Sequence, residues 1–199
     1  MLERFKYTGA STSIGKMPRN FNAGVGGDKI PSVLYRIQLG LLEELKKFEP
    51  KLWVISIGTN DLRQNRAFGP EEFAGYKILM QALLRTVVGS RVISTAISYR
   101  QDIKDWIVDE SNVGLKGVGE ELNKELGEEV VRWLDAPAKL DKNKHQVDHV
   151  HYNEVGYQIW DEVLFPVVDE MVKLPLVDFD WDKQRSGEGN SLLKVEGED

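Results

Sequence analysis

The stretch LWVISIGTND, residues 52–61, joins a near-continuous apolar run to a short polar turn. An apolar run without alternation is typical of a strand that is buried on both faces of a parallel sheet. Pro50, just upstream, blocks the continuation of a preceding helix. Glycine, asparagine and aspartate are favoured in turns, so residues 58–61 are predicted to end the strand. The stretch therefore predicts a buried parallel strand followed by a polar loop.

The rest of the chain alternates short strand-like runs with longer segments of helical period. Strands are also predicted at 20–25, 91–97 and 129–134, and helices at 30–48, 73–88, 118–126 and 153–173. Residues 101–112 are polar and stay unassigned, and residues 135–147 are predicted to form a loop. This alternation predicts an α/β fold, namely a three-layer α/β/α sandwich around a mostly parallel, flavodoxin-like sheet.

Length and composition indicate one globular domain. The chain has 199 residues, of which 41% are hydrophobic and 29% charged. We expect the domain to span residues 1–173 and a polar, acidic C-terminal tail to span residues 174–199. The net charge of −6 argues against a nucleic-acid partner, because phosphate binding requires a basic surface.

Several site types and locations are disfavoured by the sequence. The absence of cysteine excludes disulfides, thiolate metal sites and a cysteine nucleophile. Residues 1–6 are charged and lack an apolar core, so they do not resemble a signal peptide, and no apolar run reaches the length of a membrane span. We therefore expect a cytoplasmic protein.

Three polar segments follow predicted strands, at 24–28, 58–61 and 148–151. In open parallel sheets ligands bind at the carboxyl ends of the strands, so these segments are expected to share one site. Asp148 and His151 could act together, with the imidazole as a general base and the carboxylate fixing its tautomer. The alternative is a surface aspartate followed by a histidine at a helix start. His145, His149 and His151 could also form a metal site, but no thiolate or carboxylate set accompanies them, so no metal is expected and His145 and His149 are predicted to be solvated.

The other two segments offer hydrogen-bond donors. The side-chain amide of Asn60 could donate to an oxyanion, although a plain strand-end turn explains the same residues. The glycine-rich segment 24–28 could expose backbone N–H groups to an oxyanion or a phosphate. It matches neither the G-x-G-x-x-G fingerprint nor a P-loop, but a nucleotide-binding flavodoxin-like protein remains an alternative.

Together these segments resemble the sequence blocks of the SGNH (GDSL-type) hydrolases, over residues 1–173. Residues 22–28 look like the second block, and the resemblance implies that Gly27 gives a backbone N–H to the oxyanion hole. Residues 58–61 look like the third block, with Asn60 as the side-chain donor. Residues 148–151 look like the fifth block, with Asp148 orienting the base His151, and Tyr157 fits the pattern downstream. Within the family the chain is similar to the platelet-activating-factor acetylhydrolase catalytic subunits, which implies hydrolysis of a small acyl or acetyl ester without a cofactor.

The family's first block, a strand ending in Gly-Asp-Ser with the nucleophilic serine, has no counterpart in the sequence. The resemblance implies that this strand and its serine would lie before Met1, so we expect no nucleophile in the chain. Ser11, Thr12 and Ser13 lie in a polar stretch that is predicted to be a turn or a helix cap. Two functions stay open: an ester hydrolase seen without its first block, or a non-catalytic relative that binds a small ligand or a protein. The oligomeric state is not indicated.

Overall fold

The computed structural model describes residues 20–177, which form five helices and three strands. In chain order these are α1 (Ile30–Gln38), α2 (Leu41–Lys46), β1 (Leu52–Ile55), α3 (Pro70–Thr86), β2 (Arg91–Thr95), α4 (Asp105–Leu126), β3 (Val131–Leu134) and α5 (Glu154–Met171). Every strand is followed by a helix, as the sequence predicts for a parallel sheet.

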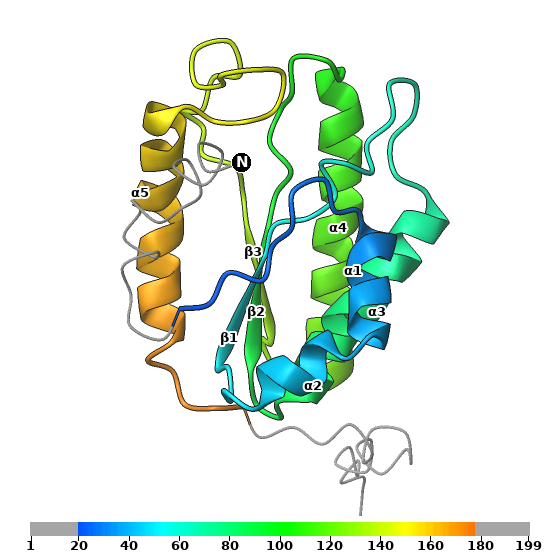
Figure 1. Ribbon diagram of the computed structural model, residues 1–199, viewed down its shortest axis with the longest axis vertical. Helices are drawn as coiled ribbons and strands as arrows, with labels where there is room; N and C mark the ends of the chain where they lie inside the picture. The colour runs from blue at the N-terminus through cyan, green and yellow to red at the C-terminus, as the bar shows by residue number, and fades with distance from the viewer. Residues whose placement is uncertain (1–19, 178–199) are drawn as a thin grey trace, which may run out of the picture.

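The described sheet has the order β1-β2-β3, and both strand pairs are parallel. Figure 1 shows α5 on one face of the sheet and α1, α3 and α4 on the other. The predicted α/β fold with helices on both faces of a parallel sheet is therefore confirmed. Within residues 20–177, β1 has no strand on its outer side, and Val54 on this edge is 39% exposed. The strand that the resemblance places before Met1 stays a prediction.

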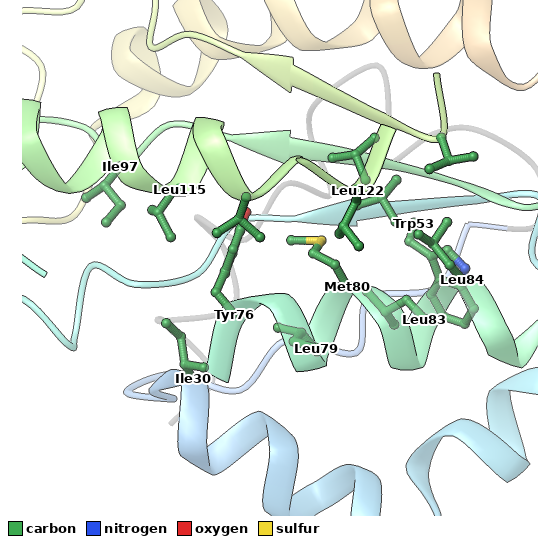
Figure 2. Close-up of a cluster of buried hydrophobic side chains, with 14 of the residues drawn as sticks. Ile30, Trp53, Tyr76, Leu79, Met80, Leu83, Leu84, Ile97, Leu115 and Leu122 are labelled. Atoms are coloured by element: carbon green, nitrogen blue, oxygen red, sulfur yellow. The ribbon is translucent and has the colours of Figure 1, made fainter. Parts of the chain in front are cut away.

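The larger core lies between the sheet and helices α3 and α4 (Figure 2). Helix α3 contributes Tyr76, Leu79, Met80, Leu83 and Leu84, which recur at helical spacing and are all nearly inaccessible to solvent. Buried residues of α4 pack against these side chains, and buried residues of β1 and β2 complete the core on the side of the sheet. Burial of this stripe fixes α3 against the sheet and so sets where the loop between β1 and α3 ends.

A smaller core on the opposite face holds α5. Ile93 of the central strand packs with Val168 and Met171 of this helix. Leu174 joins the same cluster, and Val177 is buried in the larger core, with its backbone N–H bonded to Gly89 O at 3.0 Å. Residues 174–177, predicted to be part of a loose tail, are therefore attached to the domain. The prediction of a tail falls otherwise on residues 178–199, which lie outside the described residues.

Two sequence predictions near the amino end are wrong. Residues 20–25 form no strand, because local and side-chain contacts satisfy their backbone: Asn22 accepts from Gly24 N at 2.9 Å, and Arg36 donates to Ala23 O at 2.7 Å. The predicted helix 30–48 is broken into α1 and α2 at Gly40, whose φ of 97° lies in the left-handed region.

Helix α4 is much longer than the predicted helix 118–126, and it begins inside the polar segment that was left unassigned. Its first half is amphipathic, with Ile107, Val108, Ser111 and Leu115 buried on one side and charged residues on the other. The predicted strands 52–57, 91–97 and 129–134 are present but shorter, since pairing ends where the chain leaves the sheet for the loops.

Candidate active site

The polar segments that the sequence singles out lie at the carboxyl edge of the sheet. Residues 58–61 follow β1, residues 96–104 follow β2, and residues 135–153 follow β3, and all three strands point the same way. Figure 1 shows these loops, together with the chain leading into α1, at one end of the molecule. This is the edge at which parallel sheets bind ligands.

Asp148 and His151 make a tight pair within their loop. Asp148 Oδ2 lies 2.7 Å from His151 Nδ1, and Asp148 Oδ1 accepts from the backbone N–H groups of Val150 and His151, both at 2.8 Å. The His151 backbone N–H, with the ring and the Val150 N–H, holds the pKa of Asp148 below its ordinary value. Because an ionised carboxylate only accepts hydrogen bonds, the proton of a neutral ring lies on Nδ1.

The other ring nitrogen of His151 is therefore a proton acceptor. Within residues 20–177, Nε2 makes no hydrogen bond, and the His151 side chain is 64% exposed. An imidazole with one nitrogen held by a carboxylate and the other open to solvent can take a proton from an attacking group. The geometry suits general base chemistry.

A second histidine supports this loop. His145 Nδ1 accepts from Asp141 N at 2.9 Å, and its carbonyl accepts from Asn153 N at 2.9 Å. Gly156 packs so closely here that a Cβ would lie 2.5 Å from His145 O. The prediction of a solvated His145 is therefore wrong. The contact with Asp141 is local, but the close approach of Gly156 depends on how α5 packs against this loop.

Asn60 lies in direct contact with the glycine-rich segment. Its Nδ2 donates to Asp28 O at 3.0 Å, and a primary amide carries a second N–H that can donate to a ligand. Gly27, one residue before, has a φ of 85° and is exposed. The structure thus brings the segments 24–28 and 58–61 together, and both candidate oxyanion donors lie at this junction.

Two side chains that the sequence analysis missed brace the junction. Arg36 donates to Asp28 Oδ2 at 2.6 Å and to Ala23 O at 2.7 Å. Both oxygens of Asp61 accept from the backbone N–H of Ile30 at 3.2 Å, and burial raises the pKa of this carboxyl. The Asp61 contact ties the loop after β1 to the start of α1. The only signal in the sequence for this contact was the aspartate that ends the turn 58–61, because a carboxylate can accept from the free N–H groups at the start of a helix.

The base loop approaches the Asn60 loop through the segment that follows β2. The backbone N–H of Gln101 donates to His149 O at 3.1 Å, and Arg100 donates to Thr59 O at 2.7 Å. Segments 58–61 and 148–151 thus share one support. The hydroxyls of Ser11, Thr12 and Ser13 lie outside the described residues.

Two further features of residues 20–177 bear on the site. Among these residues, no group of three or more histidine, aspartate or glutamate side chains is arranged so that it could hold a metal ion. The helices of the same residues are all too short or too polar to cross a bilayer.

Comparison with known proteins identifies one family. The model of the GDSL-like lipase/acylhydrolase family matches residues 9–159. Among curated proteins, no sequence matches the chain.

Three solved structures with a similar fold are esterases of low sequence identity. A family 3 carbohydrate esterase from Clostridium thermocellum is 18% identical, with a TM-score of 0.59 over 79% of this chain and 74% of that one. A family 3 carbohydrate esterase from Talaromyces cellulolyticus is 16% identical, with a TM-score of 0.60 over 80% and 77%. A mutant acetyl esterase determined with an acetate ion is 17% identical, with a TM-score of 0.60 over 86% and 88%. At these identities the likeness establishes the fold.

Proposed function

Because the chain belongs to the GDSL-like lipase/acylhydrolase family, we propose that its site hydrolyses a small acyl or acetyl ester. The observation that carries this proposal is the contact of 2.7 Å between Asp148 Oδ2 and His151 Nδ1, at the edge of the sheet where the Asn60 loop also begins. The net charge of −6 supports a small-molecule substrate over a nucleic acid.

His151 is the proposed general base and later the general acid. Its Nε2 takes the proton of the attacking hydroxyl and returns it to the leaving alcohol. Asp148 holds the ring in the required tautomer and stabilises the imidazolium that forms. The three hydrogen bonds that Asp148 accepts from its own loop keep the carboxylate ionised for this role.

Asn60 and Gly27 are the proposed oxyanion donors. The second N–H of the Asn60 amide and the backbone N–H of Gly27 would bind the oxygen that becomes negative when the ester carbonyl is attacked. Removing one such donor reduces catalysis by about 10²–10³-fold in a well-studied hydrolase. The contact of Asn60 with Asp28 O supports this role, since it fixes the amide before a substrate arrives.

The attacking hydroxyl is proposed to be absent from these 199 residues, as the resemblance implies. In residues 20–177 no serine or threonine hydroxyl is hydrogen-bonded to His151. The chain by itself should therefore turn over esters very slowly, because catalysis without the nucleophile is limited to the residual part supplied by the oxyanion hole and binding.

The oxyanion site is tested by acetate, a probe that needs no nucleophile and that accompanies one of the fold neighbours. Titration of the isotope-labelled full chain with acetate should shift the NMR signals of the Asn60 side-chain amide and the Gly27 amide. Asn60→Ala should weaken acetate binding by about tenfold. Asn65→Ala, an exposed asparagine in the same loop, is the matched control and should leave binding unchanged. No shift at either donor would contradict the proposed site.

The nucleophile is tested by turnover and by labelling. The full chain is assayed with p-nitrophenyl acetate and then treated with a fluorophosphonate, which labels activated serines. We expect background hydrolysis and no adduct. Rapid turnover that His151→Ala abolishes, together with an adduct on one serine, would locate a nucleophile inside the chain. Acetate binding without either activity is the outcome expected if the attacking hydroxyl is missing from these 199 residues, whereas the absence of acetate binding as well would favour the non-catalytic relative.

A further inference from the structure

The segment directly after β2, residues 99–102, lies between the two halves of the proposed site. On one side Arg100 Nη1 donates to Thr59 O at 2.7 Å. On the other side Gln101 N donates to His149 O at 3.1 Å, and Gln146 Nε2 donates to Tyr99 O at 2.8 Å. Residues 99–102 thus contact both the loop that carries Asn60 and the loop that carries Asp148 and His151.

Arg100 is the buried member of the segment, with only 9% of its surface exposed. Its guanidinium binds Asp102 through two parallel hydrogen bonds, from Nε to Oδ1 at 2.8 Å and from Nη2 to Oδ2 at 2.7 Å. A bidentate pair of this kind fixes the plane of the guanidinium as well as its distance. The remaining donor, Nη1, is thereby aimed at Thr59.

The contact with Thr59 controls the residue that follows it. Thr59 O and the N–H of Asn60 belong to one rigid peptide plane, because the peptide bond does not rotate. Holding that carbonyl at 2.7 Å therefore orients the backbone from which the Asn60 side chain projects. The Asn60 amide is fixed at its other end by Asp28 O at 3.0 Å.

Asp102 faces the base loop as well. Its Oδ2 lies 3.9 Å from His149 Nε2, two residues before His151. Arg100, through its hydrogen bonds, holds the pKa of Asp102 below the ordinary value, so the carboxylate is charged at neutral pH. One carboxylate thus binds the arginine that supports the Asn60 loop and lies beside a histidine of the base loop.

We propose that Arg100, held by Asp102, is a positioning residue that fixes the oxyanion donor Asn60 relative to the base His151. The role rests on the proposed function, since it matters for chemistry only if those two groups act on one substrate. A misplacement of about 1 Å can reduce catalysis by about 10²-fold, so a rigid link between the two loops has a direct consequence for rate.

A simple contribution to stability is a weaker explanation of these contacts. The Asp102 side chain of this ion pair is 34% exposed, and ion pairs that reach solvent contribute only about 0–1 kcal/mol to stability. The contacts instead use a property that is specific to arginine, namely several N–H donors fixed in one plane. A lysine at position 100 could reach Asp102 or Thr59 O, but its single ammonium could not reproduce the planar arrangement toward both.

The test compares Arg100→Gln and Arg100→Lys with the unaltered full chain by amide hydrogen exchange, urea unfolding and acetate titration. Arg132→Gln is the matched control, because Arg132 likewise binds one carboxylate, that of Glu129, through Nε and Nη2. Its Nη1 donates to Glu170 and not to a loop of the proposed site. We expect both Arg100 variants to exchange amides at 59–61 and 149–151 about tenfold faster. Acetate binding should weaken by a similar factor. The control should change neither.

The outcomes separate the inference from the proposed function. If the unaltered chain does not bind acetate, the proposed function fails, and the exchange rates alone decide whether Arg100 links the loops. If it does bind acetate, while Arg100→Lys matches it in exchange and affinity, the positioning role is refuted. A uniform loss of stability that leaves the two loops no looser than the core would also refute it. Should Arg100→Gln not fold, the lysine variant carries the comparison.

Discussion

Replacing Gly58 by alanine should destabilise the protein and displace the Asn60 loop. Gly58 has a φ of 106°, where a residue with a Cβ is strained by about 1–3 kcal/mol. The new Cβ would lie 2.9 Å from Ile97 Cδ1 and 3.3 Å from the ring of Phe68, and both side chains are buried. Overpacking of a core costs a further 1–3 kcal/mol or so, which gives about 2–6 kcal/mol in all.

Urea unfolding of the full chain, followed by circular dichroism, measures this loss directly. Gly117→Ala is the matched control: this glycine lies inside α4, and nothing stands within 4 Å of its added Cβ. The same chemical change there should stabilise the protein by about 0.5–1 kcal/mol, because alanine is the better helix former. The two variants should therefore move the urea midpoint in opposite directions. An unchanged midpoint for Gly58→Ala would refute the strain and the close contact on which the magnitude depends.

Three further predictions concern single side chains. Burial raises the pKa of Asp61, so its contribution to stability decreases as the pH rises from 3.8 through the folded pKa. At pH 7 Asp61→Asn, which keeps an acceptor for Ile30 N, should therefore unfold at the same or higher urea concentration. Asp61→Ala removes the acceptor and should lower the free energy of unfolding by about 1 kcal/mol. The pKa of Asp148 is lowered, so the order of its loop should persist above pH 3.8 and be lost as the pH falls through the folded pKa, which an acid titration of the NMR signals of residues 148–151 will reveal. Met80→Ala should cost about 2–5 kcal/mol in thermal or urea unfolding, because this side chain is 0% exposed, while Ile78→Ala, at a position that is 55% exposed, should change stability by less than about 0.5 kcal/mol.

The sequence predicted those parts of the protein whose causes are local. The apolar run at 52–57 and the turn after it depend on neighbouring residues, and the strand and loop are found there. The Asp148 and His151 contact was predicted from a spacing of three residues, which a single turn can close. Residues 20–25 failed as a strand for the opposite reason: a strand exists only when a neighbour pairs with it, and its own residues do not supply that neighbour.

Tertiary structure alone decided how the two loops of the proposed site are held. Arg100 lies 41 residues from Thr59, and Asp61 lies 31 residues from Ile30, so no local pattern marks either contact. From the sequence alone, an arginine in a polar segment is predicted to be a solvated surface residue. In the structure the end of β2 places Arg100 against the Asn60 loop. The type of chemistry thus follows from residue identity, which the chain carries from the start. Its geometry follows from the sheet, because only parallel strands packed side by side bring those distant residues to one edge.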